Sequence, residues 1–296
     1  MLDIIKNKLK SITGLLIITV LLTSLIPAIL NYAFDFYLIY KESINTANEE
    51  VVLYAENSLI HINEYFEQSK NVLEIVVKTQ DWDNLKEIEN YISKIQNIYW
   101  NKLFHHIMIL NENGTVIISP IHNNISHKNE KINIENLNFK NNEYIITEFH
   151  FFKESNHFHP LMIFKIPQKN YYLAAEIELD AFRKIMNNEI LTTYILDQNL
   201  NGFGIENNEL QIIKNISQHG IYQDIKNLKP EQFFCNFYHN HYGVYVYSCA
   251  LKSQEFPYTL ITEIPAEKIF HLMKIQIIRT TIVFFSFRSY HYLYII

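Results

Sequence analysis

Two hydrophobic patterns dominate the N-terminal part of the chain. Residues 11–34 form a run of 24 positions without a charged side chain. At a rise of 1.5 Å per residue, such a run is long enough to cross a hydrocarbon core of roughly 30 Å. From residue 35 to about residue 80 the sequence contains neither Gly nor Pro, and its apolar residues recur mostly three and four positions apart. The patterns predict a transmembrane helix over 11–34 that continues as a long amphipathic helix.

The charges that flank this run predict its orientation. Lys6, Lys8 and Lys10 precede it, whereas Asp35 and several glutamates follow it. Basic residues stay on the cytoplasmic side of a membrane, so we expect residues 1–10 to form a cytoplasmic tail and residues 35–274 to lie outside the bacterial inner membrane. A cleaved signal peptide is the alternative, but the run does not end in an A-x-A-like site, which favours a retained anchor.

The C-terminal residues 275–296 are apolar and aromatic, but they include Arg279, Arg288 and His291. Charged side chains are costly in the centre of a bilayer. We therefore expect a truncated or defective second transmembrane segment here, with no cytoplasmic output domain behind it.

The segment between the two apolar ends changes from helical to strand-like periodicity. Asp83 offers an N-cap for a second helix that extends through Ile98. From Phe104, two apolar runs flank the turn Asn111–Gly114 and predict a β-hairpin. Further strands are expected at Tyr144–Phe152, Leu161–Ile166, Tyr171–Ile177, Thr192–Leu196, Glu231–Phe237, Val244–Ala250 and Tyr258–Thr262, with one short helix at Leu179–Met186. The predicted class is α+β, with two antiparallel sheets in tandem.

Composition excludes several classes of protein. The chain has only six glycines, and they are too scattered for a nucleotide-binding loop. A net charge of −6 gives no electrostatic footprint for nucleic acid. The sequence contains no G-x-S-x-G elbow, no H-E-x-x-H motif and no paired carboxylates of catalytic type. We therefore predict no enzyme activity, no catalytic residue, no cofactor and no nucleic-acid partner.

The order of these segments resembles the double Cache sensor, two PAS-like modules on one membrane-proximal helix in bacterial transmembrane receptors. FHHIMILNENGTVIISP is similar to the first core hairpin of that family, and YYLAAEIELDAFRKIM to the strand and helix that close its first module. TTYILDQNLNG resembles the opening hairpin of the second module. The resemblance implies a membrane-distal module over 35–188, a membrane-proximal module over 189–274, and a homodimer through the long helix.

One strand suggests where a ligand would bind. Glu176 interrupts an apolar strand and shares a face with Tyr172. A charge on an exposed face is the favoured interpretation, and a carboxylate lining the distal pocket is the other. The R-x-W-Y element of the amino-acid-sensing Cache subset is missing, so amino-acid binding is not predicted. The predicted ligand-binding set is His106, Tyr144, His150, Tyr172 and Glu176.

Thirteen histidines raise the question of a metal. His157 and His159, like His239 and His241, are i, i+2 pairs that a strand would direct to one face. No Cys or carboxylate stands beside them at diagnostic spacing, so no metal site is predicted. His105 and His106 should point to opposite faces of their strand, so at most one of them should face a pocket.

The two cysteines, Cys235 and Cys249, lie on the strands that flank His239–Gly243. A hairpin folded about Tyr242 places them opposite each other, which makes them a disulfide candidate in an oxidising compartment. Two buried free thiols are the alternative.

Taken together, these features predict a membrane-anchored extracytoplasmic small-molecule sensor of a signal transduction receptor without its output domain. A receptor remnant that only binds or dimerises is the first alternative. The second is a CSS-type periplasmic sensor of the kind that precedes EAL phosphodiesterases, although Ile117, Ile118 and Ser119 stand in place of its Cys-Ser-Ser motif.

Overall fold

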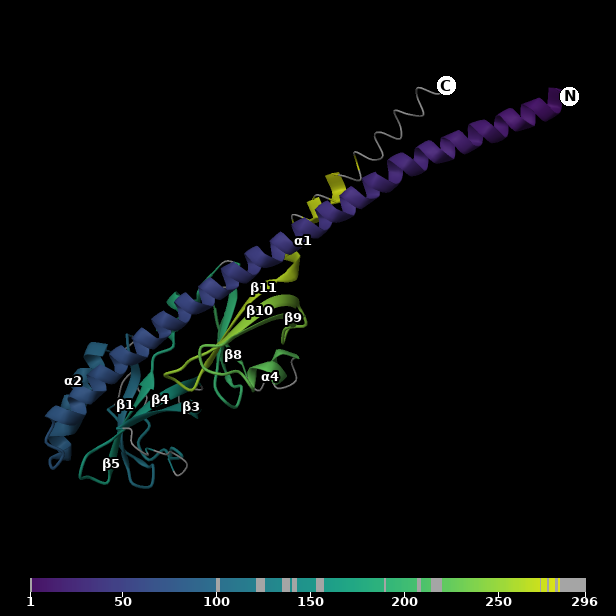
Figure 1. The fold of residues 1–296 in the computed structure, drawn as a ribbon. Coiled ribbons are helices and arrows are strands. Elements are labelled where there is room, and N and C mark those ends of the chain that lie inside the picture. The colour runs from purple at the N-terminus through teal and green to yellow at the C-terminus, as the bar shows by residue number, and fades with distance from the viewer. Residues whose placement is uncertain are drawn as a thin grey trace. The chain divides into compact units, whose positions relative to one another are not determined.

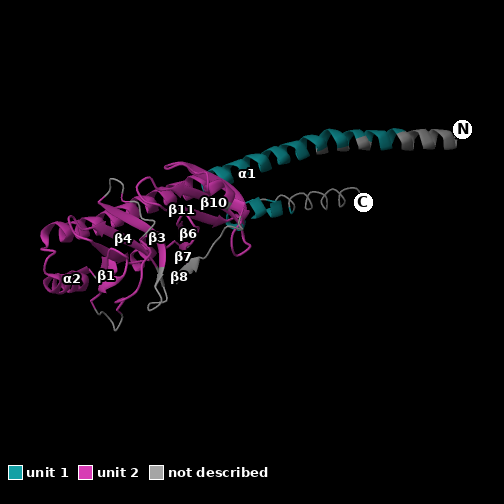
Figure 2. Cartoon of the chain, turned by 90° about the horizontal axis from the view of Figure 1, so that it is seen from below, with its two compact units in different colours: residues 1–47, 267–296 teal, residues 48–266 magenta. Residues whose placement is uncertain are grey.

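The computed structural model describes residues 2–99, 102–120, 126–134, 139, 143–152, 157–188, 190–206, 209–213, 220–271, 273–275, 277–279 and 282. These residues fall into two compact units, coloured separately in Figure 2. The first unit comprises residues 1–47 and 267–296, and the second comprises residues 48–266.

Helix α1, Leu2–Thr79, is a single helix of 78 residues (Figure 1). Its residues belong to both units. Among the described helices, α1 alone is long and apolar enough to cross a membrane. In the first unit its apolar side chains are exposed, including Ile12 at 59%, Leu15 at 70% and Phe34 at 61%. Burial of such side chains in a lipid phase removes the free-energy cost of exposing them to water. The predicted N-terminal span is therefore supported by both length and exposure.

In the second unit, α1 becomes amphipathic. Val51, Ala55, Ile62, Phe66 and Leu73 are each no more than 2% exposed, and they recur at the three- and four-residue spacing of one helix face. This face packs against both sheets of the unit.

Helix α2, Leu85–Tyr99, follows α1 after a short turn. Its N-cap is Asn84, whose Oδ1 accepts a hydrogen bond from the Glu87 backbone N–H at 3.4 Å. The prediction that Asp83 caps this helix is wrong by one residue. The carboxylate of Asp83 is instead paired with the ammonium group of Lys169.

The first sheet has five antiparallel strands in the order β2-β1-β5-β4-β3. Its strands are β1 (Phe104–Asn111), β2 (Val116–Ile118), β3 (Tyr144–Phe152), β4 (His157–Lys165) and β5 (Tyr171–Ile177). The predicted hairpin between β1 and β2 is confirmed. Gly114 occupies its turn with φ of +78°, a conformation that glycine adopts without steric cost.

The second sheet has six antiparallel strands in the order β8-β7-β6-β11-β10-β9. Helix α3 (Asp180–Met186) precedes it, and α4 (Gly220–Ile225) connects two of its strands. The strands are β6 (Thr192–Leu196), β7 (Gly202–Glu206), β8 (Glu209–Ile213), β9 (Phe233–His239), β10 (Tyr245–Lys252) and β11 (Thr259–Pro265). The sequence pattern did not predict β7 and β8, because two glycines and several polar residues weaken their apolar signal. The α+β class with two antiparallel sheets is confirmed.

An aromatic cluster joins α1 to the two sheets. The Phe66 ring of α1 lies 5.6 Å from the Phe182 ring of α3, 4.7 Å from Phe256 and 5.6 Å from Tyr258, measured between ring centroids. Aromatic rings at such distances contribute beyond the area that they bury. Because residues from both halves of the second unit meet here, one continuous core lies beneath α1.

The chain leaves the second sheet through α5, Ala266–Ile269. In the first unit, the rings of Tyr40 and Phe270 stack with their centroids 5.6 Å apart, so α1 and the C-terminal segment are neighbours there. Most of the predicted second span, including Arg288 and His291, lies outside the described residues. A second membrane segment therefore stays a prediction.

Candidate functional site

A β-bulge at the start of β1 determines how its two histidines are oriented. Phe104 pairs with Ile177 and His106 pairs with Glu176, so two positions of β1 correspond to one position of β5. The extra residue is His105. A bulge interrupts the alternation of side chains between the two faces of a sheet. The rings of His105 and His106 consequently lie 4.9 Å apart, and the prediction that they point to opposite faces of the strand is wrong.

Glu176 lies at the centre of this part of the sheet. Its strand β5 is flanked by β1 and β4, and its side chain is 0% exposed. The interpretation of Glu176 as a charge on an exposed face is therefore wrong, because the segment before β3 covers that face. Burial first, and then the negative charges of Glu130 and Glu178, raise the pKa of Glu176 well above its ordinary value.

The segment 126–134 brings a third histidine to Glu176. Nε2 of His127 lies 3.1 Å from Oε1 of Glu176, and its Nδ1 lies 2.7 Å from Oε2 of Glu130. Two backbone hydrogen bonds tie this segment to β2, from Asn129 N–H to the Val116 carbonyl and from Val116 N–H to the Glu130 carbonyl, both at 2.9 Å. The hairpin therefore positions His127 over the sheet.

The remaining polar residues of the cluster come from β4, α2 and the end of β5. The rings of His159 and His105 stack with centroids 4.8 Å apart. Gln96 of α2 accepts a hydrogen bond from Ile107 N–H through Oε1 and bonds Nδ1 of His106 through Nε2, each at 3.2 Å. Burial opposes ionisation of Glu178, but hydrogen bonds from His105 and from the Asp180 N–H lower the pKa of Glu178 overall.

A groove opens beside β3, next to the cluster, since His150 of β3 is the register partner of His159. Its cavity volume is about 870 Å³, and its walls are β3 together with residues 252–257. Tyr144 and His150 line it, as do Phe149 and Phe256. Burial lowers the pKa of His150, which favours its neutral form as a hydrogen-bonding group.

The five predicted ligand-binding residues thus do not form one site. Two line the groove, two lie in the buried cluster, and one packs against another ring. Tyr144 and His150 line the groove. His106 and Glu176 lie in the buried cluster. The ring of Tyr172 stacks on Phe139 with centroids 5.5 Å apart.

Sequence reasoning missed how the histidines of the cluster meet. The usable signal was an acidic residue inside the apolar strand of Glu176, together with many histidines between 105 and 159. Of the two i, i+2 histidine pairs, the first contributes His159 to the cluster, whereas the side chain of His157 lies outside the described residues. In the second pair, His241 contacts the ring of Tyr194, with centroids 5.1 Å apart.

Cys235 of β9 and Cys249 of β10 are register partners, and their sulfur atoms are joined in a disulfide. The bond links two adjacent strands of the second sheet.

No family model and no curated protein sequence matches this chain. Several solved structures share its fold. The extracellular domain designated rpHK1S-Z16, which is assigned to a histidine kinase, is 11% identical, with a TM-score of 0.62, and the match covers 75% of this chain and 95% of that one. The sensory Tlp3 domain of Campylobacter jejuni, solved with L-valine, is 12% identical, with a TM-score of 0.52 and coverage of 78% and 98%.

The ligand-binding domain of Mlp24, solved with asparagine, is 10% identical, with a TM-score of 0.53 and coverage of 80% and 99%. These structures are double Cache sensor domains of histidine kinases and chemoreceptors. The chain therefore has the double Cache fold that its resemblance to that family implies.

Proposed function

We propose that this chain is a membrane-anchored sensor whose extracytoplasmic residues bind a small molecule. The observation that carries the proposal is the continuity of α1. The same helix supplies the exposed apolar stretch of the first unit and the buried face beneath both sheets of the second unit. A ligand that binds one packing arrangement of the sheets on α1 more tightly than another would shift the population of helix states.

The groove beside β3 is the proposed ligand site. A volume of about 870 Å³ suits a small organic molecule. Tyr144 and Phe256 supply apolar surface, while His150, Lys252 and Glu255 supply polar groups. Lys70 of α1 lies 5.2 Å from the centroid of the Tyr144 ring, so a ligand that displaces this ring would also disturb a contact of the signalling helix.

Thermal-shift screening of the full chain in detergent tests this site. A compound at 100 times its dissociation constant should add about 2.7 kcal/mol to the unfolding free energy. Tyr144→Ala and His150→Ala should each lower the affinity for a compound found in the screen at least about tenfold, which corresponds to about 1.4 kcal/mol of binding free energy. Tyr242→Ala, in an exposed turn of the second sheet, is the control. Hits whose affinity is unchanged in both groove variants would show that the ligand binds elsewhere.

The proposed topology places residues 35–274 outside the cytoplasm. A periplasmic phosphatase fused after Asn201, in the turn between β6 and β7, should be active, and a reporter that requires the cytoplasm should be silent there. The reverse pattern would overturn the sensor proposal.

A homodimer through α1 is part of the same proposal. Leu53 and Ile60 are 59% and 53% exposed on α1, although they belong to its second unit. They are seven residues apart, which places them on the same helix face, as in helix pairs. Cysteines introduced at these two positions should crosslink between copies. A cysteine in place of His61 should not, because His61 is 61% exposed but lies about 100° around the helix from Ile60.

A further inference from the structure

A second kind of ligand is indicated by the cluster around Glu176. Within the described part of the chain, His105, His159 and Glu176 each place one ligand atom within 4.8 Å of the others. They belong to β1, β4 and β5, which are neighbours in the first sheet. A metal site needs ligands that are held by rigid elements, and three adjacent strands provide them.

The hydrogen bonds of the two histidines fix their tautomers. Nδ1 of His159 lies 3.2 Å from the Ile177 carbonyl oxygen, which can only accept, so Nδ1 carries the hydrogen. Nδ1 of His105 lies 3.3 Å from Oε2 of Glu178, an acceptor of the same kind. Nε2 is therefore the nitrogen with a lone pair in both rings. Metal-binding histidines are held in the same way, by a carboxylate or a backbone carbonyl on the other nitrogen.

Glu176 supplies the negative charge. Its side chain is fully buried, and among the described residues its one ion-pair partner is His127, whose Nε2 lies 3.1 Å from Oε1 but outside hydrogen-bond geometry. Burial of a carboxylate without compensation is costly. A proton would satisfy one oxygen only, whereas a cation would bind the carboxylate and both imidazoles at once.

We propose that His105, His159 and Glu176 bind one divalent first-row transition metal ion of the Zn²⁺ type. Two imidazoles and one carboxylate suit such an ion, whereas Ca²⁺ and Mg²⁺ prefer all-oxygen ligand sets. Tetrahedral ligands at the usual bond lengths lie about 3.4 Å apart, so the side chains must close together slightly around the ion. His105 is 21% exposed and provides both the entry route and a place for a water ligand.

The neighbouring group His106, His127 and Glu176 also meets the distance criterion, but it is less suited to an ion. Gln96 bonds Nδ1 of His106 through its amide nitrogen, and its orientation is fixed because its oxygen accepts the Ile107 N–H. Nδ1 of His106 is thus an acceptor and Nε2 carries the hydrogen, which prevents Nε2 from binding a metal. His127 instead acts as a positioning residue that holds the Glu176 carboxylate from the opposite side.

This proposal does not depend on the ligand of the groove. The experiment uses the full chain, purified in detergent with a tag that contains no histidine and stripped with a chelator. Co²⁺ titration, followed by its visible absorption, and Zn²⁺ competition should show one bound ion. Zn²⁺ should also raise the unfolding temperature. His105→Gln, His159→Gln and Glu176→Gln should each weaken binding by at least about 100-fold, and Glu178→Gln by about 10–100-fold, as expected for a residue that orients a ligand.

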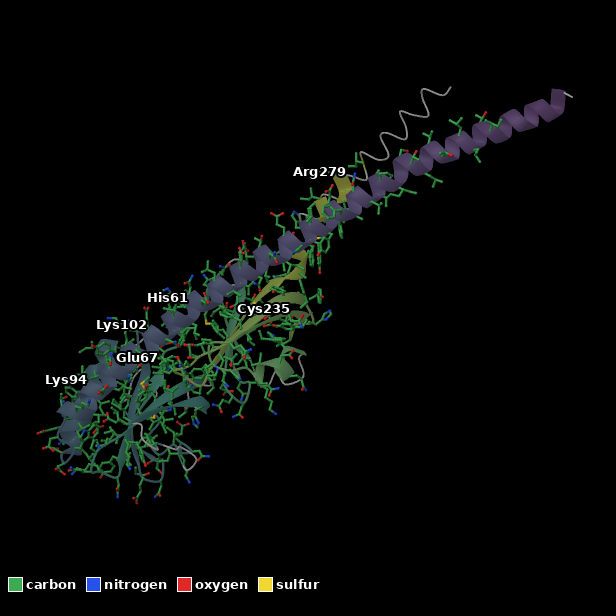
Figure 3. All side chains as sticks on the ribbon, viewed as in Figure 1. His61, Glu67, Lys94, Lys102, Cys235 and Arg279 are labelled. Atoms are coloured by element: carbon green, nitrogen blue, oxygen red, sulfur yellow. A yellow bond between two sulfur atoms is a disulfide. The ribbon has the colours of Figure 1, made fainter. Side chains whose placement is uncertain are left out.

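His61→Gln is the matched control. His61 lies on α1 (Figure 3) with 61% of its side chain exposed, and it should retain full binding. The unfolding transition in chelator checks that each variant is folded. If a variant of a buried residue does not fold, the metal affinity of His105→Gln decides the test, because His105 is partly exposed. Absence of Zn²⁺ binding by the unmodified chain, or unchanged binding in His105→Gln, would overturn the proposal. Loss of binding in His106→Gln alone would overturn this ligand set.

Discussion

His127 Nε2 lies 3.1 Å from Glu176 Oε1, and both side chains are completely buried. The contact joins the segment between β2 and β3 to the central strand of the first sheet. Because β2 also holds this segment through backbone hydrogen bonds, the cover of the sheet and the buried carboxylate are coupled. The position of this segment and the environment of the Glu176 carboxylate are therefore held by the same set of contacts.

The turn at Gly114 should be essential for the position of this cover. A Cβ atom at Gly114 would lie 2.1 Å from the Ile132 carbonyl oxygen, and φ there is +78°. Gly114→Ala should lower the unfolding free energy by about 2 kcal/mol or more, because it adds a backbone clash to an unfavourable φ.

Gly243→Ala is the matched control for this variant. Gly243 has φ of +77°, but no atom lies within 4 Å of the position that a Cβ atom would take there. Its replacement should cost only the conformational strain, about 1 kcal/mol. Denaturant unfolding of both variants measures the difference. Equal losses would mean that the contact with Ile132 does not constrain the turn.

Phe66 should be among the most sensitive core positions. It is 1% exposed and packs on Phe182, Phe256 and Tyr258. Phe66→Ala should destabilise the fold by about 3–5 kcal/mol, since it leaves a cavity beneath both sheets. Ile75→Ala, 58% exposed on the same helix, should change stability by less than about 0.5 kcal/mol. A small loss for Phe66→Ala in thermal or denaturant unfolding would show that α1 is not part of one shared core.

The disulfide between Cys235 and Cys249 should form in protein taken from the cell envelope. Mass spectrometry after alkylation without reduction should detect no modified cysteine, and reduction should expose both. The bond has a sequence separation of 14, so its loss should cost roughly 3 kcal/mol. Reductant should lower the unfolding temperature of the unmodified chain but not that of a double Cys235→Ala, Cys249→Ala variant. Two alkylated cysteines in unreduced material would contradict the bond.

Glu263 should make the stability of the second sheet depend on pH. Burial raises the pKa of Glu263, and hydrogen bonds from Tyr238 and Asn240, with a contribution from Tyr194, only partly oppose it. Between the ordinary value of 4.5 and the raised pKa of the folded state, the folded chain holds a proton that the unfolded chain has lost. The contribution of Glu263 to stability therefore falls as the pH rises through this window.

Glu263→Gln should remove this pH dependence. The stability of the unmodified chain should fall relative to that of the variant as the pH rises from about 4.5. Denaturant unfolding at a series of pH values measures this difference in stability. Glu112→Gln, in an exposed turn, is the control. A difference that stays constant with pH would mean that Glu263 ionises in the folded state as it does in the unfolded state.

The sequence by itself determined the elements whose signals are local. The uncharged run 11–34, the helical spacing of Ala55, Ile62 and Phe66, and the turn at Gly114 each reflect a geometry that a few neighbouring residues impose. The opposition of Cys235 and Cys249 also follows from one short hairpin. These features gave the α+β class and the order of the two sheets.

Only the tertiary structure decided the chemistry of the candidate site. Alternation along β1 predicts opposite faces for His105 and His106, but a bulge against β5 brings both to Glu176. Burial of Glu176 depends on the segment around His127, which lies 49 positions away in the sequence. Bulges and covering segments arise from pairing between distant strands, and a local hydrophobic pattern contains no information about them.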